Sequence, residues 1–164
     1  MFPAPMLEEA RRLLAAVRAK GARLATAESC TGGLLCGVLT EIAGASEVLE
    51  CGLVTYSNAA KERLLGVPGE LLAVHGAVSD VIARAMAAGA LARSGADLAL
   101  SVTGIAGPGG ASAAKPVGLV YLGLARREGP SLCCEHRFGN IGRTAIRLRS
   151  IEAAFALLWQ ALRE

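Results

Sequence analysis

The chain has 164 residues, of which 53% are hydrophobic and 19% charged, and its net charge is +3. This length fits one domain, over residues 1–164, and the apolar share excludes a disordered chain. No apolar run approaches the roughly 18 residues of a membrane span, and basic residues do not cluster as on a nucleic-acid-binding surface. We therefore expect a globular domain without membrane or nucleic-acid partners.

The N-terminal stretch "MFPAPMLEEARRLL" reaches two glutamates before any apolar block, so it lacks the order of a secretory signal. The five cysteines are an odd number and show no metal-ligand spacing. A reducing compartment fits this usage best. We expect a cytoplasmic protein that binds no metal and no organic cofactor.

Helix-like and strand-like segments alternate in the first half of the chain. Apolar residues at helical spacing predict helices over residues 6–20, 30–43 and 59–67. Apolar and β-branched segments between them predict strands over residues 22–28 and 47–57.

Strands cluster in the second half. Residues 79–94 predict a helix with Ser79 as its N-cap. Strands are expected over residues 97–104, 117–127 and 131–138. The last helix begins near Asn140. This order predicts an α/β fold, a three-layer α/β/α sandwich whose mixed, largely parallel sheet has helices on both faces.

Three polar loops each follow a predicted strand, where open α/β sheets bind ligands. The first is "ESCTGG". Ser29 or Thr31 can simply cap the next helix while Gly32 and Gly33 allow close packing. Alternatively, Ser29 is a nucleophile at a helix N-terminus, where backbone N–H groups stabilise developing negative charge. Cys30 is a rival nucleophile, because helix N-termini lower thiol pKa values.

The second loop, "VTYSNAAKERL", contains Tyr56 and Lys61. In the plain interpretation Tyr56 packs and Lys61 is solvated. A lysine near a buried polar site can instead lose its proton and act as base to a serine hydroxyl, with Tyr56 relaying or orienting that proton. His75 and His136 are the only histidines and lie in unlike contexts, so a Ser-His-Asp triad has little support.

The third loop, "SVTGIAGPGG", matches neither the Walker phosphate loop nor the dinucleotide-binding glycine pattern. Its glycines can serve as a flexible connection, or they can let backbone N–H groups approach a phosphate. Lys115, Arg143 and Arg147 are candidate phosphate partners because guanidinium groups match phosphate oxygens. Taken one at a time, each arginine fits a solvated surface position better than a phosphate site.

The motifs together resemble one family. "TAESCTGGLL", "VTYSNAAKERLLGV", "HGAVS", "SVTGIAGPGG", "KPVGLVYLGLA" and "FGNIGRTAIR" follow the order of the competence/damage-inducible protein (CinA) C-terminal domain family, from about residue 7 to residue 162. Stand-alone members of that family are nicotinamide-nucleotide amidases. The resemblance implies an α/β/α sandwich that hydrolyses nicotinamide mononucleotide to nicotinate mononucleotide and ammonia, in pyridine-nucleotide recycling.

The resemblance also implies a serine nucleophile working with a lysine and a tyrosine. Carried onto this chain, these are Ser29, Lys61 and Tyr56. It further implies that the glycine-rich loop surrounds the nucleotide, through Thr103, Gly104 and Gly107. We expect Lys61, when neutral, to deprotonate Ser29 directly or through Tyr56, while backbone N–H groups near Cys30 and Gly32 hold the oxyanion.

The chain departs from the family pattern at the expected phosphate end. Ala114 stands where an acidic residue is usual, and "NIG" precedes Arg143 where the family commonly has Gly-Asp-Arg. Many members also carry an N-terminal pyrophosphatase-like domain, which we do not expect here. Two alternatives stay open: an amidase that uses Cys30, and a non-catalytic nucleotide-binding module. A homodimer is the expected assembly, and a DNA-binding role has the least support.

Overall fold

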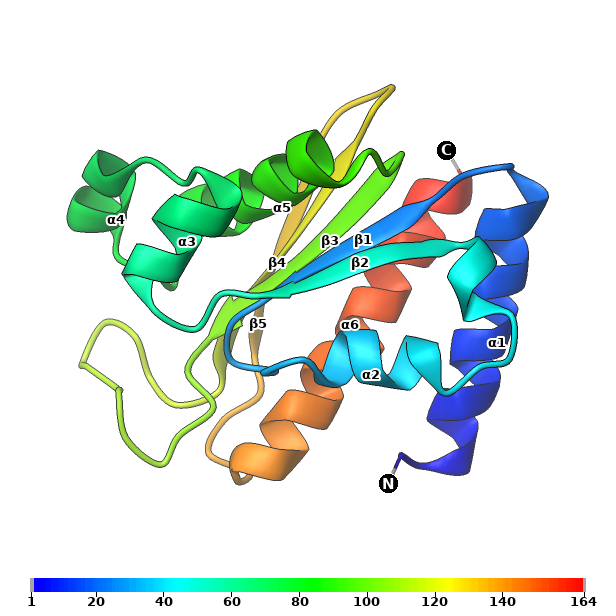
Figure 1. Cartoon of the computed structure of the whole chain (residues 1–164). Coiled ribbons are helices and arrows are strands. Elements are labelled where there is room, and N and C mark those ends of the chain that lie inside the picture. Colours follow the sequence, from blue (N-terminus) through cyan, green and yellow to red (C-terminus); the bar gives the residue numbers. More distant parts are fainter. Residues whose placement is uncertain (1, 164) are drawn as a thin grey trace.

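The computed structural model, which describes residues 2–163, is built on a five-stranded sheet with helices on both faces (Figure 1). Its strands are β1 (Leu24–Glu28), β2 (Leu49–Val54), β3 (Leu98–Gly104), β4 (Leu119–Arg126) and β5 (Leu132–Arg137). Its helices are α1 (Ala4–Ala19), α2 (Leu34–Thr40), α3 (Asn58–Leu65), α4 (Gly69–His75), α5 (Asp80–Ser94) and α6 (Arg143–Arg163), with a 3₁₀ turn η1 (Ala45–Glu47). The expected α/β class is confirmed.

The strand order is β2-β1-β3-β4-β5. β1 pairs in parallel with β2 and β3, whereas β4 is antiparallel to both β3 and β5. The mixed sheet is thus confirmed, but "largely parallel" describes it loosely because half of its pairings are antiparallel. Since β5 runs in the same direction as the first three strands, four strands end at one edge of the sheet.

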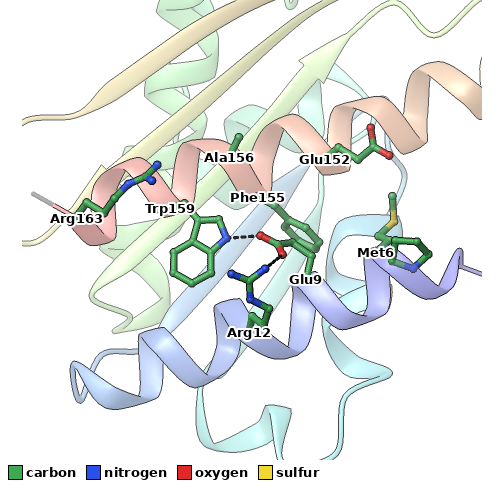
Figure 2. Close-up of a pocket in the computed structure, with 9 residues that line it drawn as sticks. Met6, Glu9, Arg12, Glu152, Phe155, Ala156, Trp159 and Arg163 are labelled. Atoms are coloured by element: carbon green, nitrogen blue, oxygen red, sulfur yellow. Dashed lines mark hydrogen bonds and ion pairs between the residues drawn. The ribbon is translucent and has the colours of Figure 1, made fainter.

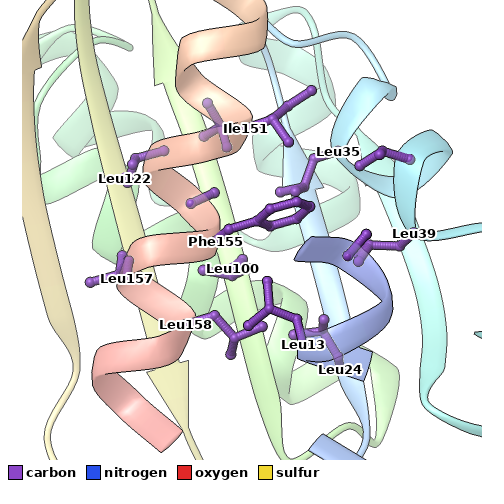
Figure 3. Packing of buried hydrophobic residues seen from close by; sticks show 14 of the residues in the cluster. Leu13, Leu24, Leu35, Leu39, Leu100, Leu122, Ile151, Phe155, Leu157 and Leu158 are labelled. Carbon is purple, nitrogen blue, oxygen red and sulfur yellow. The ribbon is translucent and has the colours of Figure 1, made fainter. Parts of the chain in front are cut away.

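Alternation of side chains along the strands divides the core into two layers. Leu24 and Leu100 face α1, α2 and α6. Ala25 and Ala99, their neighbours in sequence, face α3, α4 and α5. Large aliphatic side chains fill the first layer around Phe155 of α6 (Figure 3).

The second layer is thinner because alanines and a serine cover that face of the sheet. The hydroxyl of Ser101 donates to the carbonyl of Ala83 in α5 at 2.6 Å. Gly89 of α5 lies so close to α3 that an added Cβ would stand 2.0 Å from the carbonyl oxygen of Leu65. This close packing fixes α3, which carries Lys61, against the sheet.

Several helix boundaries differ from the sequence expectations. The helix expected over residues 30–43 covers only Leu34–Thr40, because Gly32 and Gly33 have φ of +59° and +96° and form turns. The last helix begins at Arg143 rather than near Asn140, since Gly142 has φ of +93°.

Helix α4 was not predicted from the sequence, because its seven residues are too few to show a helical period. The N-cap of α5 is confirmed, because the Oγ of Ser79 accepts from the amide of Ile82 at 3.3 Å. None of the helices within residues 2–163 combines the length and the apolarity of a membrane span.

Candidate active site

The edge where β1, β2 and β3 end brings the three polar loops together. The turn after β1 carries Ser29, the connection from β2 to α3 carries Tyr56, and the glycine-rich loop follows β3. The start of α6 joins them because β5 ends at the same edge (Figure 1). Residues from all four segments line one cavity of about 280 Å³.

A serine and a lysine from two of these segments are hydrogen-bonded inside the cavity. The Nζ of Lys61 lies 3.0 Å from the Oγ of Ser29 and 2.8 Å from the carbonyl oxygen of Thr55. Lys61 is only 1% exposed. It is buried because Lys61 and Leu65 stand one turn apart on the face of α3 that packs inward.

Burial lowers the pKa of the Lys61 amine below its ordinary value of 10.5, because the charged form loses its hydration. Within residues 2–163 no carboxylate forms an ion pair with this amine. A neutral amine has two N–H donors and one lone pair. It can therefore donate to the Thr55 carbonyl and direct its lone pair at the hydroxyl of Ser29.

The backbone of Ser29 is held on both sides. Its amide donates to the carbonyl of Val102 in β3 at 2.9 Å, and its carbonyl accepts from the amide of Gly32 at 3.1 Å. The Gly32 amide, expected at the oxyanion, is thus engaged inside the turn. In the described chain the amides of Cys30 and Thr31 both donate to no oxygen of another residue. Cys30 lines the cavity and Thr31 does not, so the Cys30 amide is the candidate donor for a substrate oxyanion.

Cys30 also lines the cavity, but its thiol is buried. Desolvation raises the pKa of this thiol to about 12, so the thiol is almost entirely protonated at pH 7. The thiolate, not the thiol, is the nucleophile of cysteine enzymes. The environment therefore disfavours Cys30 and favours the hydroxyl that has a base beside it.

Tyr56 and Arg143 lie on the outer side of the cavity. Tyr56 is 62% exposed, and its hydroxyl accepts a hydrogen bond from Arg143 at 2.9 Å. Arg143 also donates to the carbonyl of Gly107 at 2.7 Å. In the part of the chain that is described, the Tyr56 hydroxyl bonds to neither Ser29 nor Lys61. Its geometry thus does not place it as the proton relay.

The expected residues of the glycine-rich loop line the cavity. The hydroxyl of Thr103 donates to the carbonyl of Ala77 at 2.7 Å, which joins β3 to the segment before α5. A Cβ on Gly104 would lie 2.7 Å from the side chain of Val120, so glycine keeps β3 and β4 close. Gly107 has φ of +77°, a conformation that favours glycine.

Five other expected binding residues stand outside the lining of this cavity: Thr31, Gly32, Gly33, Lys115 and Arg147. Two of them join a helix to a loop instead. Arg147 donates to the carbonyl of Thr31 at 2.7 Å, and the amine of Lys115 donates to the carbonyl of His75 at 2.6 Å. Of the candidate phosphate partners, the structure brings only Arg143 to the cavity.

A larger cavity, of about 650 Å³, lies between α1 and α6 (Figure 2). Its carboxylate Glu9 is engaged, because it accepts from Arg12 at 3.0 Å and from the indole N–H of Trp159 at 2.5 Å. The residues that line it include no serine, cysteine or lysine. The chemistry therefore places the candidate active site in the smaller cavity.

Residues 7–162 match a family model described as the CinA C-terminal domain, and this match spans nearly the whole chain. The chain belongs to the CinA C-terminal domain family.

Proteins similar to this CinA domain are of two sizes. A protein of Enterobacter agglomerans named nicotinamide-nucleotide amidohydrolase PncC is 50% identical over 150 residues, which cover 92% of this chain and 89% of that protein. A CinA-like protein of Geobacter sulfurreducens is 58% identical over 142 residues, which cover 87% of this chain and 33% of that protein. This chain thus spans about a third of the length of the longer relatives.

The fold of this CinA domain matches a solved structure closely. The crystal structure of the competence/damage inducible protein CihA from Agrobacterium tumefaciens superimposes with a TM-score of 0.96 at 52% identity. The match covers 100% of this chain and 99% of that chain.

Some features of this CinA site were not expected from the sequence. The Thr55 carbonyl orients Lys61, and a backbone carbonyl gives no signal in residue type. Ala77 and Val78 form part of the wall; they belong to the "HGAVS" motif, which carried the resemblance but no assigned role. Glu28 stands in the first motif, and its buried carboxylate was not assigned either.

Proposed function

We propose that this chain hydrolyses the carboxamide of nicotinamide mononucleotide, with Ser29 as nucleophile and Lys61 as general base. The observation that carries the proposal is the 3.0 Å contact between the Ser29 hydroxyl and a buried amine of lowered pKa. The PncC relative, named a nicotinamide-nucleotide amidohydrolase and matched over 89% of its length, supports the choice of substrate.

In the first step the neutral Lys61 takes the proton of Ser29 while the Oγ attacks the carboxamide carbon. The Thr55 carbonyl keeps the amine oriented through its 2.8 Å hydrogen bond. Because Lys61 already contacts Ser29, we propose direct transfer, with Tyr56 as a wall of the cavity. The tetrahedral oxyanion accepts a hydrogen bond from the Cys30 amide.

In the second step the protonated Lys61 returns its proton to the leaving nitrogen, and ammonia departs. The product is an ester between the nicotinoyl group and Ser29. Lys61, neutral again, then deprotonates a water molecule that attacks this ester. Nicotinate mononucleotide leaves, and Ser29 recovers its proton.

The lining of the cavity suits a substrate with an aromatic ring and an anionic end. Ala77, Val78 and Ile105 offer apolar surface to a pyridine ring. Arg143, on the outer side, offers guanidinium donors to a phosphate. We propose that the phosphate displaces at least one of the two internal hydrogen bonds of Arg143.

The test is ammonia release from nicotinamide mononucleotide, nicotinamide and NAD, each supplied in turn to the purified protein. We expect release from the mononucleotide, a loss of at least about 10³-fold in Ser29→Ala and Lys61→Met, and retained turnover in Cys30→Ala. Full activity in Ser29→Ala, or a loss confined to Cys30→Ala, would reject the serine mechanism. Binding of the mononucleotide without any release would favour a non-catalytic module.

A further inference from the structure

A buried carboxylate that the mechanism does not use stands directly before the nucleophile. Glu28 is 0% exposed. Its Oε2 accepts from the amides of Gly33 at 3.1 Å and Leu35 at 3.0 Å, and its Oε1 accepts from the amide of Cys36 at 2.8 Å. One side chain thus satisfies three N–H groups where α2 begins.

Glu28 and Ser29 point to opposite faces of the sheet. The carboxylate of Glu28 reaches α2 on one face, whereas the hydroxyl of Ser29 meets Lys61 of α3 on the other. Glu28 does not line the cavity. A role as proton acceptor for the substrate is therefore excluded by position.

The backbone of Glu28 extends this network toward the lysine. Its carbonyl accepts from the amide of Thr55 at 2.7 Å, and the carbonyl of Thr55 in turn accepts from Lys61. Glu28 thus connects the turn that holds the nucleophile, the strand end that orients the base, and the first turn of α2.

These contacts have two consequences for the turn between β1 and α2. Glu28 holds both ends of this turn, because its backbone precedes Ser29 and its carboxylate binds the amides where α2 begins. Ser29 therefore cannot shift relative to α2 without breaking charge-assisted hydrogen bonds. The α2 amides that Glu28 binds are also unavailable to a substrate oxyanion. Of the turn amides that donate to no oxygen, those of Cys30 and Thr31, Cys30 belongs to the cavity lining. Its amide is therefore the donor whose position the Glu28 contacts set.

We infer that Glu28 is a positioning residue, which holds Ser29 and the Cys30 amide in the geometry for attack without touching the substrate. This inference rests on the proposed function of Ser29. Displacing a reacting group by about 1 Å can cost about 100-fold in rate, and ground-state binding depends on other walls of the cavity. Loss of Glu28 should therefore lower kcat much more than it changes KM.

The test compares Glu28→Gln with Ser101→Ala. Glutamine keeps the size but offers one acceptor oxygen, and its NH₂ group faces backbone donors. Ser101 is the matched control, because it is fully buried, its hydroxyl bridges α5 and β4, and its side chain makes no hydrogen bond to the turn. We expect kcat to fall about 10–100-fold in E28Q with KM within threefold of wild type, whereas S101A loses thermal stability and keeps kcat per folded molecule.

A second readout does not depend on the natural substrate. A fluorophosphonate probe reacts when the Oγ of Ser29 attacks phosphorus, fluoride leaves, and Lys61 takes the proton. Its rate of labelling at Ser29 should fall in E28Q in parallel with kcat. If E28Q does not fold, Glu28→Asp, which keeps the charge but shortens the reach, takes its place with the same expectation.

The inference is overturned if E28Q matches S101A, with lower stability but wild-type kcat and labelling rate per folded molecule. An equal rise in KM and fall in kcat/KM, with kcat unchanged, would also overturn it. A wild-type protein that is labelled at Ser29 yet releases no ammonia from the mononucleotide would refute the proposed substrate. The labelling rates would then still decide the role of Glu28.

Discussion

Lys61 is buried in a chain whose other lysines, Lys20 and Lys115, are at least partly exposed. Burying an amine is costly unless it sheds its charge or gains a partner, and Lys61 has hydrogen bonds but no ion pair in the described chain. Strongly perturbed groups of this kind concentrate at functional sites. A structural role alone would be served better by an apolar residue of the same size.

The activity should depend on the titration of Lys61. Its pKa lies below 10.5, and the base must be neutral, so kcat/KM should rise with pH along a limb centred below 10.5. Lys61→Arg, which stays charged, should be inactive at every pH. The measurement is kcat/KM against pH, with Lys20→Met as a lysine control that keeps the limb.

The lowered pKa of Lys61 also predicts how the free energy of unfolding varies with pH. Because the folded pKa is lower than the unfolded one, the unfolded chain binds the extra proton between the two values, so the free energy of unfolding rises with pH through that window. Conversely, the wild-type protein loses this part of its free energy of unfolding as the pH falls to and through the folded pKa of Lys61. Lys61→Met should therefore gain stability relative to wild type as pH falls, and a difference independent of pH would contradict the shift.

At the scale of elements, the position of the base depends on how closely α3 approaches α5. Gly89 permits this approach, because a Cβ there would stand 2.0 Å from the backbone of Leu65. Leu65 lies one turn from Lys61 on the same buried face of α3. Helix packing in this layer thus sets the distance between Lys61 and Ser29.

Gly89→Ala should destabilise the protein by about 3 kcal/mol, because a backbone carbonyl cannot yield as a flexible side chain can. It should also lower kcat by displacing α3. The matched control is Gly37→Ala in α2, where the nearest atom to an added Cβ is 3.6 Å away, on Phe2. That change should stabilise by about 0.5–1 kcal/mol, as alanine does within helices. Urea denaturation of both variants measures the difference, and equal stabilities would refute the packing argument.

At the scale of the whole molecule, the site exists because four strands end at one edge and deliver their loops to it (Figure 1). One of the larger cavities lies between α1 and α6 and is lined by different residue types (Figure 2). The expected homodimer and the expected cytoplasmic location depend on the protein's surroundings, and both stay predictions.

In the longer CinA relatives this domain is about a third of the chain, so activities of those whole proteins are a separate question.

Ligand binding should distinguish the two cavities. Nicotinamide mononucleotide at about 100 times its Kd should stabilise Ser29→Ala by about 2.7 kcal/mol, which for a chain of this size raises Tm by roughly 5–10 °C. Adding Arg143→Ala, in the candidate active site, should reduce the shift. Adding Arg12→Ala, in the cavity between α1 and α6, should leave it unchanged. If the rise in Tm depends on Arg12 instead, the mononucleotide binds in the cavity between α1 and α6, and the proposed site is refuted.

The fold class, the order of nearly all elements and the family could be predicted from the sequence, because periodicity, caps and motifs are local properties. It also pointed to Ser29 and Lys61 as residue types able to do the chemistry. The three-dimensional structure adds that these two side chains touch, that Tyr56 bonds to Arg143 instead, that Lys115 and Arg147 each join a helix to a loop, and that Glu28 anchors the turn. Values of pKa, hydrogen-bond partners and cavity walls depend on burial and on contacts between residues up to 150 positions apart, and no local pattern records these.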